Sequence, residues 1–320
     1  MQPQQLSYVV AVAEHRHFTR AAEALEVAQP SLSASIRALE TELGAPLFHR
    51  ARGNVTLTSA GEALLPIAKR ILADIEAARQ EVSSLVRLRG GRVRLGATPS
   101  LCTGLLPGVL ADFRRDYPGV TLQLREGGSR DLVRALDGGD LDLALVILPL
   151  SPREQGLVTQ PLLREELVLA TATETFGPPS AGPVPMAALD GVPLLTFRRG
   201  YDLRTALEAA CRSAGVQPWL VVEGGELDAM VALAEAGVGA CLLPTSVAQR
   251  ARLVSYRLDA EQMTRTVGLA RRKGHATAGA VRALRQTLDD HLRDDPQPGG
   301  IEVVGSALDP ADVSVARGRD

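Results

Sequence analysis

Two aspartates that stand close together are the first candidates for chemistry. Asp140 and Asp142 lie two residues apart in GDLDLAL, and paired carboxylates can share general acid and base roles in an enzyme. Here an apolar run typical of a buried strand follows them, so a turn and a strand entrance account for both acids. The sequence contains no GxSxG nucleophile elbow, P-loop or dinucleotide fingerprint. The sequence therefore favours a protein that is not an enzyme, with an α/β enzyme as the main alternative.

Cysteines and histidines give no sign of a disulfide framework or a metal centre. Cys102, Cys211 and Cys241 are odd in number and far apart, which suits a reducing cytosol. Cys102 is best explained as a small buried residue, because no second cysteine lies near it in the sequence. The five histidines are scattered without the spacing of metal ligands. We therefore predict no metal and no cofactor.

A proline inside a helical pattern predicts a helix–turn–helix. TRAAEALEVAQPSLSASIRALETELG, residues 19–44, is helical in composition, but a helix interior tolerates Pro30 poorly. A first helix that ends near Leu25 and a second that begins near Pro30 remove the conflict, because proline suits the first turn of a helix. The second helix would pack inward through Leu32, Ile36, Leu39 and Leu43. Its opposite face carries small and polar residues that suit the major groove of DNA, namely Pro30, Ala34 and Arg37, with Ser31 and Ser33 at the flanks.

The segment after this helix predicts a second DNA contact. GAPLFHRARGNVTLTSAG, residues 44–61, has an apolar anchor, a basic cluster and a strand-like VTLT. Arg50 and Arg52 flank a turn at Gly53 and Asn54, the shape of a wing that can hold phosphate or the minor groove. A solvated hairpin with incidental arginines is the alternative. The position behind a recognition helix favours DNA contact.

Residues 59–89 show the pattern of one long helix. Ser59 and Glu62 form a capping box at its start, and Pro66 predicts a kink soon after it. Apolar residues recur every seven positions at Leu64, Ile71, Ala78 and Leu85. A single helix of this length has no core of its own, so the pattern predicts a coiled-coil-like partner helix. Packing within one chain is the alternative.

From residue 92 onward short apolar strands alternate with amphipathic helices, which predicts parallel sheets covered by helices. Two similar halves are suggested, and such folds bind ligands in the cleft between them. The last residues are rich in Pro, Gly and Asp and are expected to be peripheral. The predicted regions are 1–58 for the helix–turn–helix domain, 59–89 for the linker helix, 90–294 for the α/β domain and 295–320 for the tail. Within the α/β domain, subdomain I covers about 92–162 and 268–294, and subdomain II covers about 163–267.

Residues 17–72, HFTRAAEALEVAQPSLSASIRALETELGAPLFHRARGNVTLTSAGEALLPIAKRIL, resemble the N-terminal signature of LysR-type transcriptional regulators. The resemblance extends to about residue 293 through RLGATPSL, GDLDLAL and MVALAEAGVGACLLP. It implies a winged helix–turn–helix, a dimerising linker helix and a periplasmic-binding-protein-like effector domain of two α/β subdomains. It also implies a regulator that binds an interrupted inverted repeat of double-stranded DNA as a homodimer or homotetramer. A small-molecule effector is the implied ligand, and RNA polymerase is a possible further partner.

The resemblance assigns DNA-contacting residues position by position. The matching positions are Gln29, Pro30, Ser31, Ser33 and Ala34 at the start of the recognition helix, Arg37 on its DNA face, and Arg50 and Arg52 in the wing. At Ala34 and Ser35 this chain has shorter side chains than many family members. Base readout there is weaker or different, so the operator sequence stays open.

The resemblance also implies effector contacts. Thr98 and Ser100, in ATPSLCTG, match positions that often hold a polar group of the effector, and a helix start suits an anion. A simple helix cap at Ser100 or Thr103 is an equal alternative. Arg198 suits an acidic effector, although adjacent arginines are often merely solvated. The other residues expected to line the cleft are Leu101, Ser129, Ile147, Phe197 and Gly224.

Charge and hydropathy narrow the class of protein. The formal net charge of −2 argues against a globally basic coat, so any DNA binding comes from a local surface. The sequence contains no run of eighteen apolar residues and therefore predicts no membrane span. The N-terminus also lacks the pattern of a signal peptide. Both observations predict a cytoplasmic protein. A solute-binding protein shares the effector-type fold, but the N-terminal helix–turn–helix disfavours it.

Overall fold

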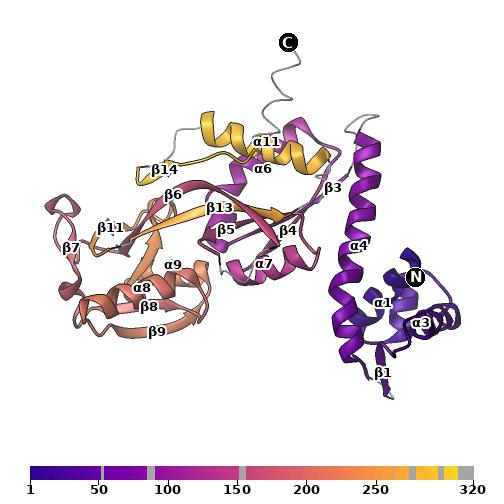
Figure 1. Ribbon diagram of the computed structural model, residues 1–320. Helices are drawn as coiled ribbons and strands as arrows, with labels where there is room; N and C mark the ends of the chain where they lie inside the picture. The colour runs from indigo at the N-terminus through magenta and orange to yellow at the C-terminus, as the bar shows by residue number, and fades with distance from the viewer. Residues whose placement is uncertain are drawn as a thin grey trace, which may run out of the picture.

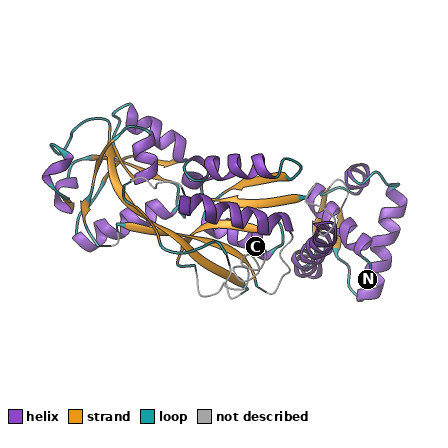
Figure 2. Cartoon of the chain, turned by 90° about the horizontal axis from the view of Figure 1, so that it is seen from above, coloured by secondary structure: helices purple, strands orange, loops and turns teal. Residues whose placement is uncertain are grey.

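The chain has three parts in a row: a small helical domain, a long helix and a larger α/β domain. Figure 1 shows the long helix between the other two, and Figure 2 shows the same order from above. The computed structural model describes residues 1–51, 54–84, 91–150, 156–261, 263–273, 279–294 and 299–308.

The N-terminal domain is a helix–turn–helix followed by a hairpin. Its elements are α1 (Pro3–His15), α2 (Phe18–Ala24), α3 (Gln29–Leu43), β1 (Phe48–Ala51) and β2 (Asn54–Leu57). The chain breaks between α2 and α3, with Pro30 in the first turn of α3, as the sequence predicts. Leu32, Ile36 and Leu39 are fully buried against α1 and α2. Leu43 was predicted to join them but is 43% exposed, because it ends the last turn of α3 just before the Gly44 cap.

The long helix α4 (Ser59–Ser84) continues through Pro66. It packs against α1, and Ala68 on this side is fully buried in the core of the N-terminal domain. This is the contact within one chain that the sequence left as an alternative. Residues 85–89 of the predicted helix, including Leu85 of the heptad pattern, lie outside the described residues.

The α/β domain is built on one hydrogen-bonded path of strands in the order β4-β3-β5-β13-β6-β10-β8-β9. Strands β3, β4 and β5 pair in parallel at one end, and β8, β9 and β10 do so at the other. The strands on the path are β3 (Arg92–Ala97), β4 (Thr121–Glu126), β5 (Leu143–Leu148), β6 (Leu157–Thr171), β8 (Pro193–Phe197), β9 (Trp219–Gly225), β10 (Ala240–Pro244) and β13 (Thr264–Arg272). Short pairings add β7 (Val184–Pro185), β11 (Val254–Tyr256) and β12 (Leu258–Asp259).

Helices cover both ends of this sheet. Those of subdomain I are α5 (Pro99–Thr103), α6 (Leu106–Asp116), α7 (Ser129–Asp137) and α11 (Gly279–Asp294). Those of subdomain II are α8 (Asp202–Ala214), α9 (Leu227–Glu235), α10 (Thr245–Arg250) and the 3-10 turns η1 (Pro179–Ala181) and η2 (Met186–Leu189). Separate apolar cores form under the two sets of helices.

Two strands join the subdomains. The first part of β6 pairs with β13 as far as Glu166, and from Leu167 the same strand pairs with β10. In Figure 1 the long ribbons of β6 and β13 run from one half of the domain to the other. The cleft between the subdomains therefore has these two strands as its hinge.

The C-terminal segment differs from the prediction. Residues 295–320 were expected to be peripheral, but β14 (Ile301–Val303) pairs with β6, and Ala307 is fully buried. The pairing forms because β6 has a free edge in subdomain I, before β10 takes that side. This correction applies to residues 299–308, since 295–298 and 309–320 lie outside the described residues.

In the part of the chain that the structure describes, no helix is both long enough and apolar enough to cross a membrane.

Candidate DNA-binding surface and effector cavity

One face of α3 is exposed. Pro30, Ser31, Ala34 and Arg37 are exposed, and Gln29 is half-buried. This face follows from the 3.6-residue period, because residues 32, 36 and 39 on the other side fill the core. Small residues at the start of the helix allow close approach to base edges.

Ser33 corrects the sequence prediction. It is only 7% exposed and lies next to the core positions Leu32 and Ile36, so it is not part of the exposed face. In the wing, β1 and β2 pair as an antiparallel hairpin. The side chain of Arg50 and the whole of Arg52 lie outside the described residues.

A serine and an aspartate bridge the two subdomains. Ser129, at the start of α7, donates its hydroxyl to Oδ2 of Asp202, at the start of α8, over 3.0 Å. The same hydroxyl oxygen accepts the backbone N–H of Ile147, at the end of β5, over 3.1 Å. Two of the predicted effector residues, Ser129 and Ile147, therefore meet at the cleft, where they hold an acid from the opposite subdomain.

A buried ion pair lies on the hinge strands. Arg265 of β13 contacts Oε2 of Glu165 on β6 through Nη2 at 2.6 Å and Nε at 2.9 Å, and both side chains are almost fully buried. Nη1 of Arg265 also donates to the hydroxyl of Ser100 over 2.8 Å. The predicted effector residue Ser100 is thus a partner of the hinge arginine. Ser100 is therefore neither a simple helix cap nor part of a free anion site.

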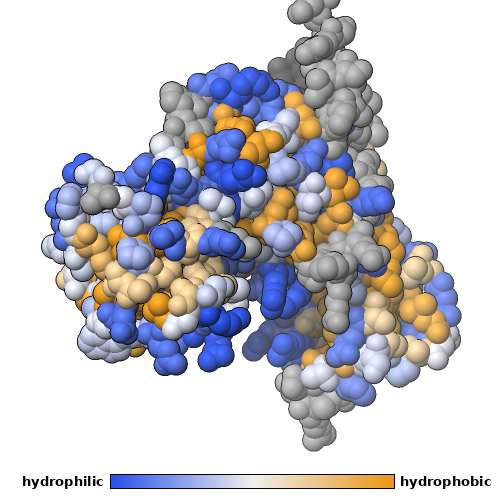
Figure 3. All heavy atoms as spheres, turned by 60° about the vertical axis from the view of Figure 1, so that its left-hand side comes forward, coloured by the Kyte–Doolittle hydropathy of each residue, from blue (hydrophilic) through white to orange (hydrophobic). Residues whose placement is uncertain are grey.

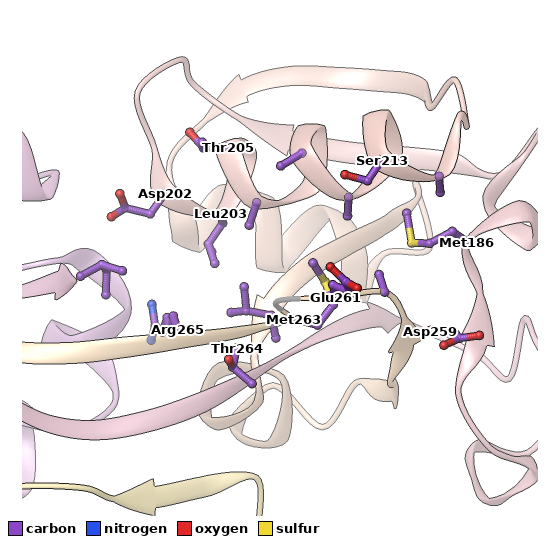
Figure 4. Close-up of a pocket in the computed structure, with 17 residues that line it drawn as sticks. Met186, Asp202, Leu203, Thr205, Ser213, Asp259, Glu261, Met263, Thr264 and Arg265 are labelled. Carbon is purple, nitrogen blue, oxygen red and sulfur yellow. The ribbon is translucent and has the colours of Figure 1, made fainter. Parts of the chain in front are cut away.

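A cavity of about 660 Å³ opens beside this pair. Figure 4 shows α8 along one side and the segment around Glu261 and Met263 along the other, with Asp202 and Arg265 at one end and Met186 and Asp259 at the opposite end. This volume lies within the range of small-molecule sites. The cavity is lined by Ile147, Leu167, Met186, Asp202, Leu203, Thr205, Ala206, Ala209, Ala210, Ser213, Ala214, Asp259, Ala260, Glu261, Met263, Thr264 and Arg265.

Of the predicted effector residues, only Ile147 lines this cavity. Leu101 and Phe197 are core residues, 3% and 1% exposed, because they pack under the helices of subdomains I and II respectively. Thr98 is also buried, and its hydroxyl has no hydrogen-bond partner among the described residues. It caps no backbone N–H of α5.

Arg198 and Gly224 also differ from expectation. Nε of Arg198 donates a hydrogen bond to Oε1 of Glu226 over 2.8 Å. The guanidinium is therefore already paired with a carboxylate of the protein near the surface. Gly224 has a φ of +100° with open space at the Cβ position, so the backbone conformation rather than a close approach explains the glycine.

Sequence reasoning missed Asp202 and Arg265. Asp202 precedes an amphipathic helix, where an acid in the first turn has an ordinary explanation in the helix dipole. The available signal for Arg265 is a basic residue in the apolar strand MTRTVGLA, matched by Glu165 in REELVLA. Opposite charges inside two strands indicate a buried pair.

Two acids near the junction of the subdomains have raised pKa values. Burial raises the pKa of Asp202, although the Ser129 hydroxyl and the cations of Arg265 and Arg130 act in the opposite direction. The pKa of Glu126 is also raised, first by burial and then by the nearby acids Asp228 and Glu226. An anion would meet like charge here.

The paired acids Asp140 and Asp142 have structural partners. Nζ of Lys69 lies 2.9 Å from Oδ1 of Asp140, and Asp142 accepts from the backbone N–H and the guanidinium of Arg94. Each carboxylate is neutralised separately, so the two do not form a catalytic pair. Within the described ranges no group of three His, Cys, Asp or Glu side chains could hold a metal ion.

Comparisons with known proteins agree with this architecture. The model of the bacterial regulatory helix-turn-helix protein, lysR family, matches residues 3–62, and that of the LysR substrate binding domain matches residues 87–293. A probable hydrogen peroxide-inducible genes activator of Streptomyces viridosporus is 36% identical, with 91% of this chain and 95% of the relative covered. The DNA-binding transcriptional dual regulator OxyR of Escherichia coli K12 is 32% identical, with 90% and 96% covered.

Solved structures show the same fold. A variant of full-length OxyR from Pseudomonas aeruginosa is similar with a TM-score of 0.71 at 26% identity, over 93% of this chain and 99% of that chain. CbnR in complex with its target DNA has a TM-score of 0.63 at 24% identity, over 90% and 99%, a likeness that concerns the fold. The predicted fold class and the regulator class are confirmed. The chain belongs to the LysR family of bacterial transcription regulators, with a DNA-binding domain and an effector-binding domain rather than an enzyme's active site.

Proposed function

We propose that the exposed face of α3 enters the major groove and that Arg37 makes its principal contact there. The support is the segregation of α3 into a buried apolar side and a free side that carries Pro30, Ser31, Ala34 and Arg37. Arg37 is exposed and forms no ion pair with the rest of the described chain, which leaves its guanidinium free for a base or a phosphate. A homodimer would place two such helices on an interrupted inverted repeat.

The effector occupies the cavity beside α8 in this proposal. The observation that carries it is the position of the cavity at the junction of the subdomains, with Ile147 from one, Asp202 from the other and Arg265 from the hinge. A ligand there can change the bridge between Ser129 and Asp202 and hence the angle between subdomains. The protein acts in the cytoplasm, where bacterial DNA lies.

Peroxide sensing by a thiol has little support in this chain, although relatives are named for hydrogen peroxide. Burial raises the pKa of Cys102 and Cys241 to about 12 and also raises the pKa of Cys211. Reactive thiols have lowered pKa values, because the thiolate is the nucleophile. A bound small molecule is therefore the better effector.

DNA binding is tested by fluorescence anisotropy on the region upstream of the protein's own gene, across a salt series. We expect Arg37→Ala to raise the Kd about tenfold or more, since one good base or phosphate contact contributes about 1–3 kcal/mol. The matched control is Arg134→Ala, which removes an exposed arginine of α7, far from α3 in sequence. Equal Kd values for Arg37→Ala and the control would contradict the proposed contact.

A further inference from the structure

The cavity beside α8 has an excess of negative charge. Asp202 lies at one end, Asp259 at the other and Glu261 between them (Figure 4). Arg265 is the only basic residue among the described lining residues, and its charge is matched by Glu165 at 2.6 Å. Three carboxylates therefore face the cavity: the cations of Arg265 and Arg130 act on Asp202, whereas Asp259 and Glu261 have no ion-pair partner within the described ranges.

The rest of the lining is mostly apolar, with hydroxyl groups from Thr205, Ser213 and Thr264, and leaves room for a chain. Ala206, Ala209 and Ala210 present only methyl groups from α8, while Met186 and Met263 supply flexible thioethers. No aromatic side chain lines the cavity in the described chain, so a cation would be held by carboxylates rather than by a ring face. Figure 3 shows weakly apolar surface on the lobe that lies to the left in Figure 1, surrounded by hydrophilic residues.

In the sequence alone, Arg198 suited an acidic effector, with a merely solvated arginine as the alternative. The structure removes that reason, since Arg198 is bound to Glu226 and does not line the cavity. A carboxylate ligand would also lie near Asp202, Asp259 and Glu261, where like charges repel. A ligand with ammonium groups would gain from the same three acids, and an alkyl chain would bury its methylenes against the alanines.

We propose that this cavity takes an organic cation, an apolar chain that carries one or more ammonium groups. The inference rests on the proposed role of the cavity as the effector site and names the class of effector. Electrostatic contacts with the exposed rim of the cavity, formed by Asp259 and Glu261, supply selectivity. The apolar part of the lining supplies contact area. Because the rim is solvated, binding weakens as salt concentration rises.

Isothermal titration calorimetry on the full chain tests the charge preference. The probes are 1,6-diaminohexane, hexylamine and hexanedioate, which share a six-carbon chain and differ in charge. We expect both amines to bind, the diamine more tightly, and hexanedioate to give no binding heat at millimolar concentration. Tighter binding of hexanedioate than of the amines, or no binding of any of the three, would overturn the inference.

A pair of variants locates the binding. Asp259→Asn with Glu261→Gln removes two rim charges, and we expect the Kd for the diamine to rise about fivefold to tenfold. The matched control is Asp190→Asn with Glu235→Gln, two exposed acids of subdomain II outside the cavity. Both variants keep their exposed positions polar, so both should fold. An unchanged Kd in the first variant would place the amine elsewhere and overturn the inference.

A DNA-binding measurement separates this inference from the function on which it rests. Anisotropy with the upstream DNA is repeated with and without the diamine. A shift in DNA affinity that the rim variant loses supports both the cation site and its role as effector. Binding by calorimetry with no shift in DNA affinity supports the cation site and contradicts its regulatory role.

Discussion

The three cysteines show how burial decides the chemistry of a single residue. Cys102 lies in α5 with its thiol 3.7 Å from the carbonyl of Ala97, Cys211 lies in α8 and Cys241 lies in β10. Their pKa values are all raised because burial disfavours the thiolate. Oxidation and alkylation both need the thiolate, so these side chains should behave as small apolar groups.

We expect the folded protein to react slowly with iodoacetamide and with hydrogen peroxide. With a pKa of about 12, the ionised fraction of Cys102 or Cys241 at about pH 7.5 is only about one in 30,000. Mass spectrometry against time measures the modification, and protein unfolded in guanidinium is the control for accessible thiols. Rapid modification of the folded chain, or a peroxide-induced change in DNA affinity, would contradict this expectation.

At the scale of elements, β14 gives the effector domain a strand outside the matched family region, which ends at residue 293. The carbonyl oxygen of Gly300 accepts a hydrogen bond from the N–H of Glu166 over 2.8 Å. The N–H of Val304 donates to the carbonyl oxygen of Leu162, also over 2.8 Å. Further along, Ala307 binds two buried charged residues of α11, since its N–H donates to Asp289 and its carbonyl accepts from Arg285. The segment thus supplies hydrogen-bond partners both to β6 and to the buried charged residues of α11.

Truncation after Asp294 should therefore destabilise the effector domain. The truncation removes these hydrogen bonds and the partner atoms of Asp289 and Arg285. We expect it to lower the free energy of unfolding by about 3 kcal/mol or more. Urea unfolding followed by circular dichroism measures the loss as a lower midpoint. Truncation after Leu308 keeps every contact described here and is the control. If both truncated chains unfold at the same urea concentration, β14 does not stabilise the domain.

At the scale of the whole molecule, Lys69 joins three parts of the chain. This residue of α4 has its Nζ 2.9 Å from Asp140 in the effector domain and 3.3 Å from Glu14 in α1. Burial lowers the pKa of Lys69, but the two carboxylates outweigh it and leave the pKa raised. Beside it, Gly139 has a φ of +78° and lies against the backbone of Arg70, where a Cβ would come within 3.2 Å of the Arg70 Cα. The turn between α7 and β5 is therefore one place where the effector domain meets the linker helix, beside the contacts of α4 with α11 and of Asp74 with Arg272.

Gly139→Val should loosen the packing of the effector domain against α4. A valine at positive φ is strained, and here its side chain would also meet the Arg70 backbone. Small-angle scattering should show a larger radius of gyration than that of the wild type. Gly191→Val is the matched control, because Gly191 has a similar φ of +71° but open space at the Cβ position. An equal radius for the two variants would show that this contact does not hold the domains together.

Local patterns of residue types are enough to predict the individual elements of this protein. Pro30 and the spacing of Leu32, Ile36 and Leu39 predict the break and the buried side of α3, because both depend on residues within a few turns. The alternation of strands and helices predicts the α/β domain for the same reason. Ser33 shows the limit even here, since its burial depends on how closely α1 and α2 pack against α3.

The cavity and the joints between domains depend on contacts between residues that are far apart in the sequence. Asp202 and Arg265 are 63 residues apart in the sequence and meet because β6 and β13 cross together between the subdomains. Glu165 forms an ion pair with Arg265 for the same reason. Glu226 likewise forms an ion pair with Arg198 in subdomain II. The register of distant strands and the burial of distant charges set these partners. A local pattern of residue types carries no information about which remote charge a side chain will meet.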